Sequence, residues 1–290
     1  MPPDLKNKKV LITGATSGIG KIAALELAKM GAHVILVGRD PQKSEQTARE
    51  IRAASHNERV DTLLADLSEM AEVRRLAAEY RRRYDRLHVL VNNAGAWYTK
   101  RQLTREGLEL TFALNHLSYF LLTNLLLELL VESTPARVIN VSSGAHFGAK
   151  LDLRDLNYEK GYISWVAYAR SKLMNIYFTY ELARRLEGSR VTANCLHPGF
   201  VATNFGKNNG GLMRPVMALA HLGAITPEQG AETIVHLASS PQVEGLSGDY
   251  YYQKRAVRSS GVSYDQEIAS QLWQASLELA GLKENQPAAD

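Results

Sequence analysis

The sequence predicts an α/β fold in which one doubly wound parallel sheet of about seven strands carries helices on both faces. Three observations lead to this prediction. Short apolar strand patterns alternate with helical patterns along the chain. A glycine-rich turn joins the first strand to the first helix, and polar or glycine residues follow six strands in succession.

The elements follow one another in a regular order. Residues 9–13 form a short apolar run, 18–30 carry apolar residues at helical spacing, and 33–37 are a second apolar run. The predicted strands are 9–13, 33–37, 60–64, 87–91, 136–141, 190–196 and 248–252. The predicted helices are 18–30, 41–55, 69–84, 104–132, 165–187, 227–239 and 265–280. Since no repeat or low-complexity linker interrupts this order, we expect one domain over 1–290, with a disordered polar tail at 283–290.

Size and composition are typical of a soluble enzyme. The chain has 290 residues, enough for a sizeable core, and 45% of them are hydrophobic. Its net charge is +4, and the basic residues are scattered along the chain apart from the arginine run 81–83. We interpret that run as a solvated helix end, so no nucleic acid partner is expected. The single cysteine, Cys195, lies in a predicted strand and excludes an internal disulfide. It indicates a reducing compartment or a protein that is indifferent to the redox state of its compartment.

No signal peptide or integral membrane segment is expected. The first nine residues are polar and lead directly into a strand. The most apolar window, 114–131, contains Asn115, His116, Asn124 and Glu128, which a lipid-facing helix would disfavour. We therefore expect a buried helix in this window and a cytoplasmic protein.

The turn after the first strand has the composition of a nucleotide-binding loop. Glycines allow the backbone to approach a pyrophosphate, and the following helix offers unpaired N–H groups and the positive end of its dipole. The spacing Gly-x-x-x-Gly-x-Gly differs from the commoner Gly-x-Gly-x-x-Gly fingerprint. Set between a strand and a helix, the turn 14–20 predicts dinucleotide binding in a Rossmann-like sheet.

Polar groups follow the other strands as well. In a doubly wound sheet the ligand binds beyond the carboxyl ends of the strands, so these groups are expected on one rim. They are Gly38-Arg39, Asp66-Leu67, Asn92-Asn93-Ala94-Gly95, Ser142-Ser143 and His197-Pro198-Gly199.

Tyr168 and Lys172 are four residues apart in a predicted helix and therefore share one face. An ammonium beside a phenol favours the phenolate, so we expect the pKa of Tyr168 to fall from about 10 towards working pH. Such a phenol is a general acid/base for a substrate oxygen, which a nearby serine hydroxyl can hold. The spacing alone arises often by chance, and the nucleotide turn is what gives it weight.

With these motifs the chain resembles the classical short-chain dehydrogenases/reductases over about 9–282. The similarity rests on Thr13-Gly14-x-x-x-Gly18-Ile19-Gly20, Asp66-Leu67, Asn92-Asn93-Ala94-Gly95, Asn115, Ser143, Tyr168-x-x-x-Lys172 and Pro198-Gly199-x-x-Thr203. The resemblance implies hydride transfer between nicotinamide C4 and a substrate carbon.

The resemblance also implies a role for each motif residue. Tyr168 is the acid or base, Lys172 lowers its pKa and binds the nicotinamide ribose, Ser143 orients the substrate oxygen, and Asn115 supports a proton-relaying water. Taken alone, Asn115 would be read as satisfying a neighbouring backbone group. The implied cofactor-binding residues are Gly14, Thr16, Ser17, Gly18, Ile19, Gly20, Arg39, Asp66, Leu67, Asn92, Ala94, Gly95, Tyr168, Lys172, Pro198, Gly199, Val201 and Thr203.

The end of the second strand indicates NADP(H) rather than NAD. A carboxylate there would accept the ribose hydroxyls and repel a 2′-phosphate, but Gly38 and Arg39 occupy this place. A guanidinium suits a phosphate, with Lys43 and Ser17 as helpers. The alternative is that Arg39 is a surface residue at a strand end.

Within the family the chain resembles the NADP-dependent retinol dehydrogenases and the WW-domain-containing oxidoreductases. The similar segments are 153–157, 168–175, 246–251, 272–273 and 279–282. We expect neither an N-terminal anchor nor a WW domain, and therefore a soluble member of this branch.

The substrate is expected to be a small lipophilic aldehyde, ketone or alcohol, such as retinal. Glycines and asparagines followed by an apolar stretch predict a lid at about 204–222, with a plain surface helix as the alternative.

The aromatic candidates for the pocket wall are Trp97, Tyr98, Phe147 and Trp165. His146 and His197 lie near the rim, where packing is the simpler interpretation, and the dispersed histidines predict no metal site.

Two other functions stay open at this point. One is an NADP(H)-binding sensor or scaffold without turnover, which a missing Tyr168 or Lys172 would have favoured. The other is a protochlorophyllide reductase-like enzyme, for which we expect a longer insertion and more cysteines. The helices 104–132 and 165–187 pair between subunits in similar enzymes, so a homodimer or homotetramer is considered.

Overall fold

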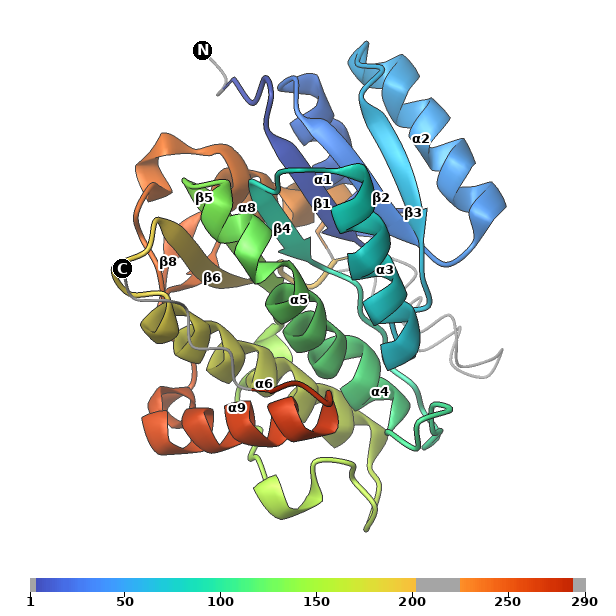
Figure 1. Ribbon diagram of the computed structural model, residues 1–290. Coiled ribbons are helices and arrows are strands. Elements are labelled where there is room, and N and C mark those ends of the chain that lie inside the picture. The colour runs from blue at the N-terminus through green and yellow to red at the C-terminus, as the bar shows by residue number, and fades with distance from the viewer. Residues whose placement is uncertain (1–3, 202–224, 284–290) are drawn as a thin grey trace.

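The computed structural model describes residues 4–201 and 225–283. Within these ranges eight strands form one sheet in the order β3-β2-β1-β4-β5-β6-β7-β8 (Figure 1). All neighbouring pairs from β3 to β7 are parallel, which confirms the predicted fold class. The strands are β1 Lys9–Thr13, β2 His33–Gly38, β3 Val60–Leu64, β4 Val89–Asn92, β5 Ala136–Val141, β6 Val191–His197, β7 Tyr250–Tyr252 and β8 Arg255–Ala256.

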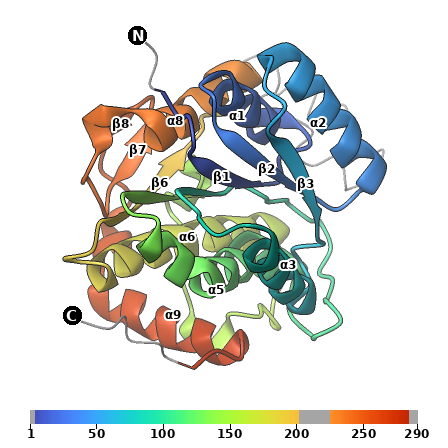
Figure 2. The same cartoon turned by 45° about the horizontal axis from the view of Figure 1, so that its top comes forward.

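Helices cover both faces of the sheet (Figure 2). One face carries α1 Gly18–Lys29, α2 Pro41–Ser55 and α8 Pro227–Ser239. The other carries α3 Met70–Arg83, α5 Ser118–Glu132 and α6 Ser164–Arg185, with α9 Gln266–Leu279 lying outside α6. The short helix α4 Leu110–Phe112 and a π-helical turn, Ala113–Leu117, lead into α5.

Alternate side chains of the strands enter two separate hydrophobic cores. In β2, Ile35 and Val37 belong to the core under α3, α5 and α6, whereas Val34 and Leu36 belong to the core under α1 and α8. This period of two is what a sheet buried on both faces requires. It also explains why the strands read as continuous apolar runs in the sequence.

The predicted helix 104–132 is wrong at its N-terminal end, because the helical stretch begins with α4. Gly107 adopts a positive φ of 80°, which ends the preceding turn. The Glu109 carboxylate then accepts hydrogen bonds from the amides of Thr111 and Phe112 at 3.0 and 2.8 Å. Such an acidic cap fixes the start of a helix, which apolar spacing alone does not reveal.

The sheet has one more strand than the sequence predicted. After β7 the chain reverses through Gln253 and Lys254, whose φ values are 49° and 65°, and β8 pairs antiparallel with β7. Two consecutive positive φ angles are the geometry of a tight hairpin turn. A strand of two residues leaves no periodic signal in a sequence.

Helix α9 covers part of the helix pair that was considered for subunit contact. The Trp273 ring lies 4.9 Å from that of Phe120 in α5 and 5.9 Å from that of Phe178 in α6, measured between centroids. The Arg185 guanidinium lies 4.4 Å from the same indole. This portion of the α5 and α6 surface is therefore buried within the chain.

One helical stretch among the described residues, Leu110–Glu132, is long and apolar enough to cross a membrane by length and composition. Of the 18-residue apolar window within it, 67% is buried inside the protein. Its position between α3 and α6 is that of a core helix (Figure 2).

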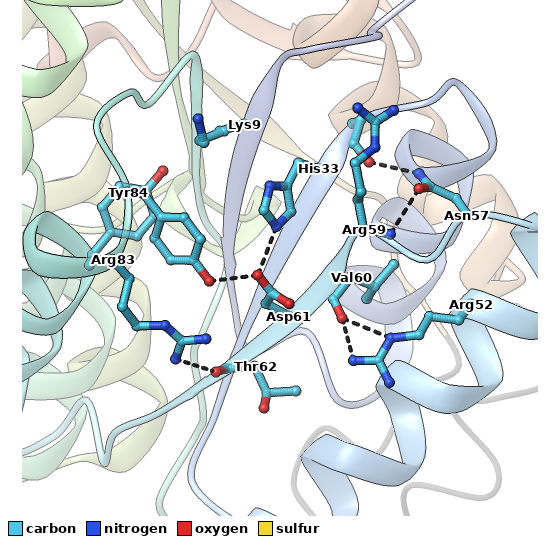
Figure 3. A network of polar contacts seen from close by, with 12 residues as sticks. Lys9, His33, Arg52, Asn57, Arg59, Val60, Asp61, Thr62, Arg83 and Tyr84 are labelled. Atoms are coloured by element: carbon cyan, nitrogen blue, oxygen red, sulfur yellow. Dashed lines mark hydrogen bonds and ion pairs between the residues drawn. The ribbon is translucent and has the colours of Figure 1, made fainter.

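A polar network ties the amino-terminal ends of β2 and β3 to the end of α3 (Figure 3). The Asp61 carboxylate accepts hydrogen bonds from His33 Nε2 and from the Tyr84 hydroxyl, both at 2.8 Å. Burial by itself raises the pKa of Asp61, but the bonds from Tyr84 and His33 outweigh it and lower the pKa.

We expect Asp61→Asn to lower the free energy of unfolding by about 1 kcal/mol at pH 7, since a charge-assisted pair at a half-exposed site is lost. The folded-state pKa of Asp61 is lowered, so this contribution is complete above the unfolded pKa of about 4 and disappears as pH falls through the folded value. Urea unfolding of both proteins at pH 7 and pH 3 tests this. An equal difference at both pH values would contradict the assignment to the ionised carboxylate.

Candidate active site

The strand order places the candidate residues on one rim of the sheet. The chain runs from β1 outwards to β2 and β3 and then returns to β4 on the other side of β1 (Figure 1). This reversal is the topological switch point at which doubly wound sheets bind ligands. The glycine-rich turn after β1 therefore faces the segment after β4.

The glycine-rich turn is packed so closely that side chains would not fit. A Cβ on Gly14, where φ is 65°, would lie 2.8 Å from the Ala94 Cα. A Cβ on Gly20 would lie 2.5 Å from Asn93 Nδ2 and 2.6 Å from the Gly14 carbonyl oxygen. The turn therefore brings bare backbone to the rim.

The start of α1 is open to an anion. Ser17 occupies the N-cap position but makes no capping hydrogen bond through its side chain, and the first turn carries no acidic residue. The amides from Gly18 onward therefore face the rim without a competing carboxylate. These residues fit the pyrophosphate of a dinucleotide, and Thr16, whose methyl group lies beside Gly38, completes this wall.

Two residues of the quoted motifs that were not predicted as site residues hold the turn in place. The Asn93 side chain donates to the carbonyl oxygens of Thr13 and Gly14 at 2.8 and 3.3 Å. The Thr13 hydroxyl accepts from the amides of Asn93 and Ala94 at 2.8 and 3.0 Å. The tandem asparagines were the signal for this role, but Asn93 was not among the predicted site residues.

Asn92 points away from the rim. Its side chain is fully buried and donates to Thr123 in α5 and to Asn140 in β5, both at 2.9 Å. It therefore connects the sheet with a helix beneath it, and only its backbone lies near the turn. The predicted contact of Asn92 with the cofactor would therefore be made by its backbone.

The ends of β2 and β3 carry three more of the predicted cofactor-binding residues. Arg39 is exposed directly after β2 and forms a hydrogen bond with Tyr98 from the segment after β4. Asp66 instead holds its own turn, since its carboxylate accepts from the Ser68 amide and hydroxyl at 3.1 and 2.6 Å. Leu67 beside it is buried.

Asn115 lies in the π-helical turn and is fully buried. Its side chain donates to the Ala96 carbonyl and accepts from the Ala96 amide, each at 2.9 Å, and it also donates to the Ser171 hydroxyl at 3.0 Å. It therefore fixes the segment after Gly95. A Cβ on Gly95 itself would lie 3.2 Å from Asn115 Oδ1 and 3.3 Å from Lys172 Nζ.

Ser143, Tyr168 and Lys172 come together at the carboxyl end of β5. The Lys172 ammonium donates to the Val141 carbonyl at 3.1 Å and lies 5.7 Å from the centre of the Tyr168 ring. The Ser142 hydroxyl is turned inward and donates to the Lys172 carbonyl at 2.7 Å. Ser143 is the serine that bonds to Tyr168, as the resemblance implied.

The predicted lowering of the Tyr168 pKa is wrong for this structure. Burial raises the pKa of Tyr168 to about 12, although the hydrogen bond with Ser143 acts in the opposite direction. Burial also lowers the pKa of Lys172 to about 7, which weakens the ammonium as a source of positive charge. At neutral pH the phenol is therefore protonated, the form that donates a proton to a carbonyl oxygen.

Aromatic side chains extend outward from Tyr168. The Trp165 ring lies 5.6 Å from that of Tyr168 and 5.8 Å from that of Trp97. Trp165 is 51% exposed and Phe147 is 57% exposed, whereas Tyr98 is buried. The rim beside the phenol therefore presents apolar surface.

Strand β6 ends with His197, whose Nδ1 accepts from the Gly199 amide at 3.2 Å. Its ring stacks on that of Tyr252, with 4.8 Å between the ring centroids. Packing thus accounts for this histidine. Pro198 and Gly199 follow on the rim, and Val201 pairs with Ile225. Thr203, the predicted lid at 204–222 and all but the first residue of the predicted tail lie outside the described residues.

Comparison with known proteins agrees with this site. Residues 8–211 match the family described as short chain dehydrogenase. Human retinol dehydrogenase 11 is 42% identical over 278 residues, covering 96% of this chain and 87% of that relative. Human polyprenol dehydrogenase is 40% identical over 289 residues, covering 97% and 87%.

Solved structures have the same architecture. An uncharacterized protein from Mycobacterium paratuberculosis matches with a TM-score of 0.80 and 33% identity, covering 99% of this chain and 97% of that one. The Pseudomonas aeruginosa RhlG/NADP active-site complex matches with a TM-score of 0.69 and 29% identity, covering 86% and 96%.

Fold and rim together define an oxidoreductase of the Rossmann type that binds a nicotinamide cofactor. The chain belongs to the short-chain dehydrogenase/reductase family, and within it the chain is similar to the retinol dehydrogenases.

Proposed function

We propose that the chain is an NADP(H)-dependent oxidoreductase that transfers a hydride between nicotinamide and the carbonyl or alcohol carbon of a lipophilic substrate. The observation that carries this proposal is the position of Ser143, Tyr168 and Lys172 around one buried phenol, beside an open helix N-terminus. We further propose that one catalytic domain spans the chain.

The residues assigned to the reaction act on the substrate oxygen. When bound, the reduced cofactor supplies the hydride for the carbonyl carbon. Ser143 donates a hydrogen bond to the carbonyl oxygen, and Tyr168 transfers its phenolic proton to that oxygen, which yields the alcohol. The Lys172 ammonium stabilises the phenolate that remains, and oxidation of an alcohol runs the same steps in reverse.

NADP(H) is favoured over NAD by the charge at the end of β2. Arg39 is exposed and carries no carboxylate partner in the described structure, while the neighbouring Asp40 turns its side chain to the Lys43 amide at 2.9 Å as the cap of α2. A guanidinium in this place suits a 2′-phosphate. RhlG, whose structure holds NADP, shares the fold.

A lipophilic substrate is supported by the apolar rim at Trp165 and Phe147 and by the names of the relatives, which refer to retinol and polyprenol. Retinal or another aldehyde or ketone fits this chemistry. A cytoplasmic location and a homodimer or homotetramer are part of this proposal.

The proposal is tested by mixing the protein with NADPH or NADH and a panel of apolar aldehydes and ketones that includes retinal. We expect NADPH absorbance to fall in the dark with at least one substrate, and faster than NADH absorbance. NADPH binding without turnover across the panel would support the sensor or scaffold function instead. Turnover only under illumination would support the protochlorophyllide reductase-like function.

A further inference from the structure

Two buried histidines adjoin the proposed catalytic residues without belonging to them. His116 directly follows Asn115 in the π-helical turn, and His146 lies three residues after Ser143. Both side chains are fully buried. Each one is hydrogen-bonded on its other side to the C-terminal segment Ser259–Leu279, which contains α9.

The partners of His146 determine where its proton lies. Nε2 accepts from the backbone amide of Ser260 at 3.0 Å, since an amide can only donate. Nδ1 lies 2.7 Å from the carbonyl oxygen of Ser143, which can only accept, so Nδ1 carries the hydrogen. Burial lowers the pKa of His146, although the bond to Ser143 acts against this. The neutral ring therefore connects Ser260 with the backbone of Ser143.

His116 makes an equivalent connection on the other side of the catalytic centre. Its Nδ1 lies 3.3 Å from Asn175 Oδ1, and its Nε2 lies 3.2 Å from the Ser276 hydroxyl in α9. The Ser276 hydroxyl also donates to the Leu272 carbonyl at 2.7 Å. Burial lowers the pKa of His116 to about 4, and this ring is also neutral.

Asn175 carries the connection from His116 to Lys172. Its Nδ2 donates to the Asn115 carbonyl at 2.9 Å and to the Val141 carbonyl at 3.4 Å. The Val141 carbonyl is also the acceptor for the Lys172 ammonium. A displacement of Asn175 therefore alters the backbone on which Lys172 depends.

The C-terminal segment is itself anchored on α6, the helix that carries Tyr168 and Lys172. The Tyr177 hydroxyl donates to the Val262 carbonyl at 2.7 Å. The Tyr180 hydroxyl lies 2.7 Å from the Ser259 hydroxyl. The segment thus contacts α6, the Ser143 turn and the Asn115 turn, which approach the centre from three directions.

We infer that the segment Ser259–Leu279 is a positioning element of the catalytic centre, acting through His146 on Ser143 and through His116 and Asn175 on Lys172. The inference rests on the proposed function for its effect on turnover. Catalytic groups must be held within about 0.5 Å of their working geometry, and a misplacement of about 1 Å can reduce the rate about 100-fold. His116, His146 and Asn175 are positioning residues, because they act through other groups.

The connection through α9 is tested by Ser276→Ala with Ser239→Ala as its control. Ser239 in α8 makes the same hydrogen bond to the carbonyl four residues before it, at 2.8 Å, but its hydroxyl forms no hydrogen bond with a histidine in the described part of the chain. We expect Ser276→Ala to lower kcat about threefold to tenfold, with KM for NADPH within about twofold. Equal kcat values for the two variants would overturn the role of α9.

The connection through His146 is tested by His146→Asn. Asparagine retains a donor near the Ser143 carbonyl but is too short to reach Ser260, so it separates the local turn from the link to the C-terminal segment. We expect kcat to fall about tenfold, with the KM for NADPH within about twofold. Wild-type kcat in a folded His146→Asn protein would restrict His146 to the local turn and overturn the inference.

Hydrogen exchange provides a readout that requires no turnover. We expect the amides of residues 143–147 to exchange about tenfold faster in His146→Asn than in wild type or Ser239→Ala. Unchanged exchange would contradict the link. A wild-type protein without turnover would refute the proposed function, while this comparison would still decide whether the segment holds the Ser143 turn.

Discussion

Tyr168→Phe is expected to lower kcat for carbonyl reduction about 1,000-fold, within the range for loss of a general acid, while the Kd for NADPH stays within about twofold. The substitution removes the phenolic oxygen and its hydrogen bond with Ser143 but keeps the ring beside Trp165. Since only the proton donor is lost, kcat should fall while the affinity for NADPH is retained. Steady-state kinetics and NADPH titration measure the two quantities.

The matched control is Tyr80→Phe. Tyr80 in α3 is also fully buried, and its hydroxyl donates to the Arg86 carbonyl at 2.8 Å, far from the rim. This variant should lose some stability and keep the wild-type kcat. A Tyr168→Phe protein that loses NADPH binding but retains turnover in proportion to the bound fraction would remove Tyr168 from the chemistry.

Arg39→Asp is expected to raise the Kd for NADPH about 100-fold, since charge-assisted bonds to a phosphate contribute about 1.5–3 kcal/mol. The Kd for NADH should change little, because a carboxylate at this place can accept the ribose hydroxyls. Fluorescence titration with each cofactor measures both values. Arg49→Asp in α2 makes the same change of net charge at an exposed position and should leave both Kd values near wild type.

Equal losses of affinity for the two cofactors would contradict the phosphate role of Arg39. In that case its hydrogen bond with Tyr98 would be the reason for its position, since it would then hold together the segments after β2 and β4.

The larger elements could be predicted because their patterns are local. Strand β1 and helix α1 are marked by an apolar run, a glycine-rich turn and helical spacing, and the structure has them at Lys9–Thr13 and Gly18–Lys29. The start of α4 was missed because a carboxylate cap, not apolar spacing, determines it. Strand β8 was missed because two residues carry no period.

Side-chain orientation at the site was harder to predict than site membership. Tyr168, Lys172 and Ser143 were found from their spacing and from the family resemblance, and the structure brings them together. Asn92 and Asn93 are adjacent in the sequence, and only the alternation of the strand decides which one faces the rim. The direction of the Tyr168 pKa shift depends on burial, which no local pattern reports.

Deuterium transfer tests the central claim most directly. The protein is incubated with NADPH deuterated at nicotinamide C4 and with retinal or the best substrate of the aldehyde and ketone panel, and the alcohol is analysed by mass spectrometry. We predict one deuterium at the former carbonyl carbon, and none when Tyr168→Phe replaces the wild type over the same period. NADPH binding without a deuterated alcohol from any panel member would contradict the assignment of this rim as a hydride-transfer site.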